Sequence, residues 1–162
     1  TRCGDIDAEV VLDLVRQGFS TDEVERLLNN QSGLVGLSGF SSNLAEIITA
    51  AEQGNDRCRL AYEVYANRLK FYLGAYTWLL NGADAIVFTD DIGCSSWRLR
   101  AKVLSGVQNL GIALDDKKNR EVGPGREEFI NLALSPTKIL VIPTDEERVI
   151  FDEVIRLQEG KS

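Results

Sequence analysis

Residues 84–110 read DAIVFTDDIGCSSWRLRAKVLSGVQNL, and this stretch decides the fold class. The apolar run AIVFT stops at Asp90 and Asp91. Ser95 or Ser96 then offers an N-cap to a following helix. The order strand, tight turn, helix leaves unpaired backbone N–H groups at the positive end of the helix dipole, where anions such as phosphates bind. Two carboxylates nevertheless occupy this turn.

A second apolar run, KILVI at 138–142, is followed by TDEE, which can cap a last amphipathic helix. Two strands that each lead into a helix indicate neighbouring parallel strands of an α/β sheet. A further short strand is expected at 129–134, and the very polar stretch 115–128 is expected to be an exposed loop. Residues 1–162 are therefore predicted to form a single α/β domain with helices flanking parallel strands.

Helix signals dominate the chain before the first strand. Apolar residues at helical spacing predict a helix that ends at Gly18, and a capping box of Ser20 and Glu23 starts the next one. Asn43 caps a third helix. The longest helix is expected at 55–80, where apolar and aromatic residues on more than one face indicate burial against the sheet and a partner subunit. A single-faced core helix with half-exposed tyrosines is the alternative.

Residues 31–42, QSGLVGLSGFSS, carry three glycines at a spacing of three residues. Glycine permits positive φ and close approach of the backbone to a neighbour. The stretch therefore suits either a phosphate-facing loop or tight packing under a helix, and the spacing alone favours packing.

Composition excludes several classes of protein. The chain has 162 residues, of which 44% are hydrophobic and 27% charged, which is typical of a soluble globular unit. A net charge of -7 opposes binding to nucleic acid or to an anionic membrane surface. No apolar run approaches the ~20 residues of a membrane span, and no signal peptide is evident, so a cytoplasmic location is expected.

The residue counts also exclude some kinds of site. Three cysteines without CxxC spacing, and no histidine, argue against a disulfide framework or a structural zinc site. The absence of histidine removes the commonest general base. Because the chain starts at Thr1 and has no methionine, we expect it to be a piece of a longer protein.

Acidic residues follow both predicted strands. Asp90 and Asp91 follow the first strand, whereas Asp145, Glu146 and Glu147 follow the second. Ligands of open α/β sheets bind at the carboxyl ends of strands, and carboxylate oxygens there suit Mg²⁺ bound to substrate phosphates. Capping of the following helices is the alternative reading of each cluster, and without further information it is the favoured one.

Four segments in order and register resemble the acetate kinase family, including its propionate and butyrate kinases. They read TRCGDIDAEVVLDLV, SGLVGLSGFSSN, YLGAYTWLLNGADAIVFTDDIG and KILVIPTDEE, and the similarity covers almost the whole chain. The resemblance is to the C-terminal half of these enzymes. It implies the fold of sugar kinases, heat-shock proteins and actin, in which two related α/β domains enclose a cleft.

The resemblance also implies an activity, namely reversible phosphoryl transfer between ATP, with Mg²⁺, and acetate, giving acetyl phosphate. It places the carboxylate pocket and catalytic histidines in an N-terminal domain that this chain lacks, together with the opening strands of its own domain. The isolated chain is therefore expected to be inactive, and the family dimerises through this half. The length of the acyl substrate is not decided by these residues.

Individual roles follow from the same resemblance. Arg2 falls on an arginine that reaches the transferring phosphoryl group. Glu146 matches the glutamate on the metal side, with Glu147 as its near neighbour.

Two nucleotide motifs depart from the family pattern. GGIGEN becomes DDIGCS, which replaces glycines by Asp90 and Asp91 and keeps Ile92 and Gly93. SSDMRD becomes SSNLAE, which puts Asn43 and Ala45 where an aspartate and an arginine near the base or ribose are expected. A side chain at Asp91 would crowd the nucleotide and repel its phosphates unless a cation intervenes. Pyrophosphate or another nucleotide is thus the alternative donor, and a non-catalytic dimerisation or regulatory relative is the alternative function.

Overall fold

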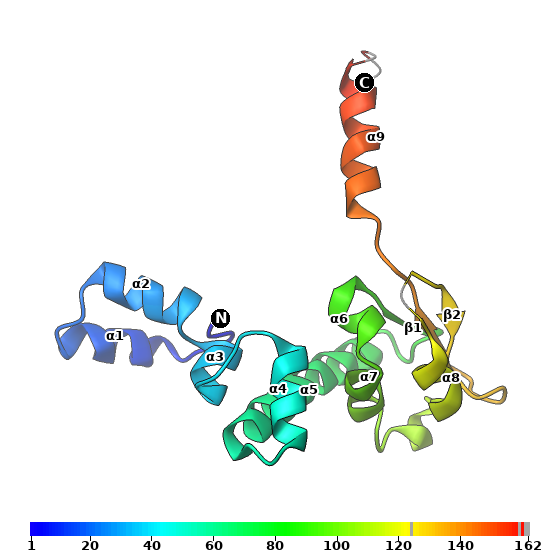
Figure 1. The fold of residues 1–162 in the computed structure, drawn as a ribbon, viewed down its shortest axis with the longest axis horizontal. Coiled ribbons are helices and arrows are strands. Elements are labelled where there is room, and N and C mark those ends of the chain that lie inside the picture. The colour runs from blue at the N-terminus through cyan, green and yellow to red at the C-terminus, as the bar shows by residue number, and fades with distance from the viewer. Residues whose placement is uncertain (124, 159, 161–162) are drawn as a thin grey trace. The chain divides into compact units, whose positions relative to one another are not determined.

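The structure is a computed structural model that describes residues 1–123, 125–158 and 160 (Figure 1). The chain divides into two compact units, Thr1–Ala75 and Tyr76–Ser162. The first is helical and the second contains a small sheet. In the part of the chain that the structure describes, no helix is long and apolar enough to cross a membrane.

The first unit is built from four short helices and most of a long one. They are α1 (Ala8–Arg16), α2 (Thr21–Asn30), α3 (Gly33–Ser38), α4 (Leu44–Glu52) and α5 (Asp56–Leu79). The predicted capping box is confirmed, since Ser20 and Glu23 bond reciprocally at the start of α2. Asn43 caps α4 as predicted, because its Oδ1 accepts from the backbone N–H groups of Ala45 and Glu46 at 2.9 and 3.4 Å.

A core of small and branched side chains joins α3, α4 and α5. Ile47, Cys58 and Ala61 are fully buried there, with Leu34 and Leu37 of α3 packed against them. The stretch 31–42, for which packing was favoured over a phosphate-facing loop, therefore contains the helix α3. Glycine weakens helix propensity, but the two leucines of α3 gain burial that outweighs this cost. Packing is thus the role that the structure gives these glycines.

Helix α5 has the predicted length but buries a different face from the predicted one. Its buried residues are the small Cys58, Ala61 and Ala66. Leu60 and Val64, which the helical spacing of apolar residues places in one stripe of this helix, are more than two-fifths exposed. Periodicity identifies an apolar stripe but not the element that covers it, and in this unit α3 and α4 pack against the small residues instead.

The second unit carries a three-stranded sheet in the order β1-β3-β2. Strand β1 (Ala85–Phe88) pairs in parallel with β3 (Lys138–Val141), as predicted, in a register that sets Phe88 opposite Val141. Strand β2 (Glu128–Phe129) pairs antiparallel with β3, so the sheet is mixed and not wholly parallel. The expected third strand is also shorter than its apolar run, with one further bridge from Asn131 to Leu114.

Short helices connect these strands. They are α6 (Asp90–Ser95), α7 (Trp97–Val103), the 3₁₀ turn η1 (Gln108–Leu110), α8 (Asp116–Glu121) and the last helix α9 (Glu146–Gln158). Two of them correct the prediction. The turn after β1 is the helix α6, and the expected exposed loop contains α8, whose Asn119 is fully buried. The polar composition of this stretch hid α8 from a search for apolar periodicity, because the residue that anchors α8, Asn119, is itself polar.

The interior of the second unit mixes apolar and polar side chains. Ile86, Ile139 and Val141 of the sheet are buried with Leu99 and Val103 of α7. Helix α9 is amphipathic, as predicted, but buries none of its residues. Its N-terminus is capped by Asp145, whose Oδ1 accepts from the backbone N–H of Arg148 at 3.0 Å.

Candidate functional site

The carboxyl ends of the parallel strands lie at one edge of the sheet, as the sequence predicts. Phe88 and Val141 are paired there, and the Ile142 N–H donates to the Phe88 carbonyl at 2.9 Å. The chain leaves β1 into α6 and leaves β3 toward α9 from this edge (Figure 1). Open α/β sheets bind ligands at such an edge. The second unit therefore presents its candidate site where the acidic segments begin.

Asp90 adopts an unusual backbone conformation at the start of α6. Its φ is +62°, in the left-handed region that non-glycine residues rarely enter. The Asp90 side chain supports this conformation, because its Oδ1 accepts from the backbone N–H of Asp91 at 2.7 Å. Asp91 lies in α6, and both carboxylates are exposed. A glycine at this position would adopt the same φ without steric cost.

Gly93 packs α6 against the end of β1. A Cβ added at Gly93 would lie 3.3 Å from the backbone carbon of Phe88. That approach is tighter than most Cβ atoms show, so a side chain at Gly93 would need the end of β1 to shift, while Ile92 beside it is half-buried. The Ile-Gly pair that the chain retains therefore fixes how the start of α6 meets the sheet.

Arg100 of α7 is the buried cation behind this turn, and the sequence reasoning missed it. Its side chain is 0% exposed and donates to the carbonyls of Gly93 and Cys94 at 2.7 and 2.8 Å. It also donates to the Oδ1 and the backbone carbonyl of Asn119 at 2.7 and 2.8 Å. Arg100 follows Trp97 by three residues and precedes Val103 by three. This helical spacing on the apolar face was the signal available in the sequence.

Burial shifts the pKa of two groups at this site. It lowers the pKa of the Arg100 guanidinium from its ordinary value, although an arginine remains charged at neutral pH. It raises the pKa of the Cys94 thiol, an effect that Arg100 opposes and that Asp90 and Asp91 reinforce. The Cys94 thiol therefore stays protonated at neutral pH and is a poor nucleophile.

The acidic segments do not form a complete metal cluster. Glu146 and Glu147 are the exposed first residues of α9. Within residues 1–123, 125–158 and 160, no group of three or more histidine, cysteine or acidic side chains is placed to hold a metal ion. Any Mg²⁺ at this edge would therefore need ligands beyond these side chains, which is usual for an ion that keeps waters and substrate phosphates.

Arg2 belongs to a segment of the first unit that is fixed by its backbone. The Cys3 N–H donates to the Leu28 carbonyl at 2.8 Å, and the Ser32 N–H donates to the Thr1 carbonyl at 2.9 Å. Gly33 has a φ of +59°, and a Cβ there would lie only 2.5 Å from the Arg2 carbonyl oxygen. The backbone of Arg2 is thus clamped between α2 and α3, while its side chain is exposed.

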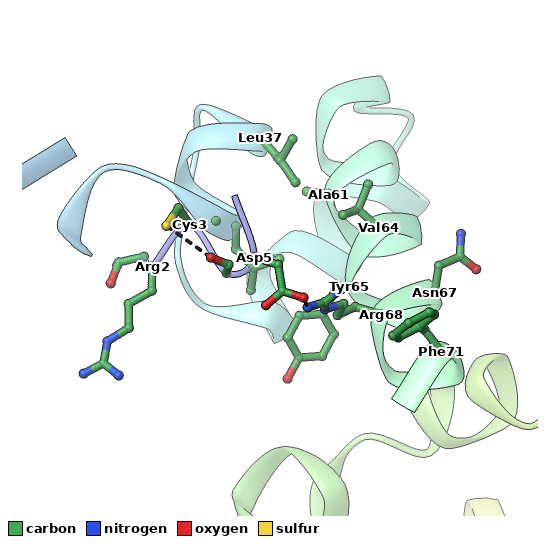
Figure 2. A pocket seen from close by; sticks show the side chains of 14 residues that line it. Arg2, Cys3, Asp5, Leu37, Ala61, Val64, Tyr65, Asn67, Arg68 and Phe71 are labelled. Carbon is green, nitrogen blue, oxygen red and sulfur yellow. Dashed lines mark hydrogen bonds and ion pairs between the residues drawn. The ribbon is translucent and has the colours of Figure 1, made fainter. Parts of the chain in front are cut away.

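A cavity of about 750 Å³ separates this segment from α5 (Figure 2). Asp5 forms an ion pair there with Arg68, which also bonds the Tyr72 hydroxyl at 2.7 Å. In Figure 2 the Arg2 side chain points away from Asp5 and Arg68. Among the described residues the Arg2 guanidinium has no hydrogen bond or ion pair, whereas the ion pair of Arg68 with Asp5 ties this segment to α5.

The remaining predicted nucleotide residues lie at the start of α4. Ala45 and Phe40 line a shallow hollow of about 350 Å³. The Asn43 side-chain oxygen is engaged in capping α4, so its amide group is the part left to meet a ligand. These residues belong to the first unit and the α6 turn belongs to the second, so each is placed only within its own unit.

Comparison with known proteins decides the family. The model of the acetokinase family matches residues 1–152. The chain belongs to the acetokinase family. Acetate kinases of Clostridium novyi and Geobacillus kaustophilus are 42% and 45% identical over 98% and 97% of the chain. The chain spans 39% of the length of each of these relatives. The resemblance found in the sequence is thus confirmed at the level of family.

Solved structures give the same assignment. The acetate kinases of Porphyromonas gingivalis and Entamoeba histolytica superpose with TM-scores of 0.88 and 0.86 at 37% and 35% identity. They cover 98% and 99% of this chain, which matches 40% and 41% of theirs. A propionate kinase of Francisella tularensis gives 0.83 at 34% identity over 93% of this chain and 38% of its own. Acetate and propionate kinases are therefore both similar to this member of the acetokinase family.

Proposed function

We propose that this chain is the C-terminal half of a phosphotransferase that makes acetyl phosphate reversibly from acetate and ATP. The observation that carries the proposal is the acetokinase match over 1–152, which includes the turn at the carboxyl edge of the parallel strands. In this proposal the sheet extends into a complete domain of the actin and sugar-kinase type. An N-terminal domain supplies the carboxylate pocket, and the isolated chain is inactive.

Arg2 would act on the transferring phosphoryl group. Its backbone is clamped at Gly33 and Ser32, and its guanidinium is exposed, so the group is held at its base and free at its tip. A positioned guanidinium stabilises negative charge that spreads over the equatorial oxygens in the transition state. Loss of this charge would lower kcat more than it raises KM.

Glu146 would hold Mg²⁺ at the phosphates. It supplies a hard carboxylate oxygen at the edge where β3 leaves the sheet, and this donor chemistry fits an ion that uses few protein ligands. The ion, when bound, would neutralise charge on the donor phosphates. Glu147, the next residue, adds a second negative charge at this place, and we assign it no role as a metal ligand.

The identity of the phosphoryl donor depends on Asp90 and Asp91, which stand where the family motif has glycines. Their two exposed carboxylates repel phosphate unless a cation lies between them. Pyrophosphate, which needs no base or ribose contact at Asn43 and Ala45, is therefore the alternative donor. A propionate or butyrate kinase would differ from the proposed acetate kinase only in the pocket for the acyl group, which the proposal assigns to the N-terminal domain.

The test is acyl-phosphate formation by the protein at its full natural length, with ATP and pyrophosphate compared side by side and acetate compared with propionate. Activity with ATP supports the first proposal, and activity with pyrophosphate alone assigns the substituted turn to donor choice. No activity with either donor in a folded protein would favour a non-catalytic dimerisation or regulatory relative.

The exposed apolar residues of α5, among them Leu60 and Val64, support a homodimer through this half.

A further inference from the structure

The buried guanidinium of Arg100 is an unusual choice for holding two helices together. None of the four hydrogen bonds that it makes within the described residues reaches a carboxylate. Burying a cation without a counter-ion carries a large desolvation penalty, so packing alone would favour an apolar residue here. Its partners are all neutral oxygens, and two of them belong to the turn after β1.

Those two oxygens lie at the C-terminal end of α6. The last carbonyls of a helix have no partner inside the helix, and they form the negative end of its dipole. The Ile92 carbonyl accepts from the Ser96 N–H at 3.1 Å, and Arg100 takes the next two, those of Gly93 and Cys94. The Arg100 side chain, which belongs to α7, therefore caps the C-terminal end of α6 by donating to its last carbonyls.

Helix α6 needs such support more than other helices do. It has only six residues, none of them buried, and its first residue is the Asp90 that adopts a φ of +62°. So short a helix is not stable alone, and the left-handed backbone conformation of Asp90 adds strain. Gly93 holds one side of α6 against Phe88 and Arg100 holds its end, so these contacts define the turn.

We propose that Arg100 is a positioning residue, which fixes the Asp90–Gly93 turn against the phosphoryl donor by holding the Gly93 and Cys94 carbonyls. This inference rests on the proposed function only in naming the donor. Asn119 orients Arg100 from behind through its Oδ1 and its carbonyl. Asn119 is itself fixed, since its amide donates to the Trp97 carbonyl at 2.9 Å. The turn, α7 and α8 are thereby joined at one guanidinium.

The test compares Arg100→Lys with Arg98→Lys in the protein at its natural length. Lysine keeps the charge but lacks the planar fork that serves several oxygens at once. Arg98 is an exposed residue of the same helix and provides the matched control. Amide hydrogen exchange is measured first, because it needs no activity. We expect exchange at 91–96 to rise at least tenfold in Arg100→Lys, with less than a twofold change in β3 and in the Arg98→Lys protein.

Kinetics then separate positioning from stability. We expect the KM for the phosphoryl donor to rise about tenfold in Arg100→Lys, with the KM for the carboxylate substrate unchanged. Unchanged exchange at 91–96, equal loss of protection in β3, or equal changes in both KM values would overturn the inference. An inactive wild-type protein would instead count against the proposed function, and the exchange comparison would still decide whether Arg100 holds the turn.

Discussion

The two units of this chain are stabilised by different kinds of contact. The interior of the first unit is apolar, with Ile47, Cys58 and Ala61 at its centre. The second unit buries polar groups, and five of the six buried polar or charged side chains among the described residues belong to it: Arg100, Asn119, Asn131, Ser135 and Thr137. All of these five have hydrogen-bond partners. The units should therefore respond differently to loss of a polar group.

The largest expected effect comes from the polar interior of the second unit. Asn119→Ala removes the Oδ1 that accepts from Arg100 and leaves a buried cation underbonded, so we expect a loss of about 3 kcal/mol in the free energy of unfolding. Urea unfolding of the full natural-length protein measures it. Asn109→Ala changes an exposed asparagine of the same unit and provides the control. A loss below 1 kcal/mol would remove the distinction between the units.

A smaller effect is expected where the first unit depends on backbone geometry. Gly33→Ala places a methyl group 2.5 Å from the Arg2 carbonyl at a φ of +59°, so we expect a loss of about 2 kcal/mol in the free energy of unfolding and displacement of the Arg2 segment. Gly74→Ala is the control, because nothing lies within 4 Å of the added atom. Thermal unfolding that is equal in the two variants would contradict the clamp.

The cap of α4 tests whether polar groups matter less in the first unit. Asn43→Ala removes the acceptor for two backbone N–H groups, and we expect a loss of about 1 kcal/mol in the free energy of unfolding. Asn30→Ala, at an exposed helical position, should change stability by less than about 0.5 kcal/mol. A raised donor KM in Asn43→Ala, beyond the change in stability, would add a ligand contact to the capping role.

The smallest expected effect is a pH dependence in the capping box of α2. Hydrogen bonds from the Ser20 backbone and then from its hydroxyl lower the pKa of Glu23 from its ordinary value of 4.5. A carboxyl with a depressed folded-state pKa stabilises the fold above its unfolded pKa, and this contribution is lost as pH falls through the folded one. The stability difference between wild type and Glu23→Gln should therefore shrink below pH 4.5. Urea unfolding of the two proteins above and below pH 4.5 measures this difference.

The same contrast explains what the sequence could predict. The capping box of Ser20, the cap of Asn43 and the parallel pair of β1 and β3 are local patterns or consequences of strand-helix order, and all are confirmed. Family membership was also predictable, because four segments match in register. The roles of Arg2 and Glu146 remain predictions.

Contacts that join distant segments could not be predicted in this way. The helices α3, α6 and α8 are too short for periodicity to reveal, and each depends on partners elsewhere in the chain. Arg100 and Asn119 are 19 residues apart and meet only in the folded unit. The positive φ of Asp90 was also outside the prediction, which considered its neighbour Asp91 as a steric obstacle to the nucleotide.

Cys58 provides a chemical probe of how often the core of the first unit opens. Its thiol is fully enclosed by the core of the first unit, while Cys3 and Cys94 are partly accessible to solvent. A thiol reagent added to the native protein can reach Cys58 only when that core opens, so at reagent concentrations where labelling is faster than closing the slow phase measures the rate of opening. Replacing Cys3 and Cys94 by serine would leave Cys58 as the one thiol of these 162 residues. The time course of its labelling, followed by mass spectrometry, would then report how often the helical unit opens.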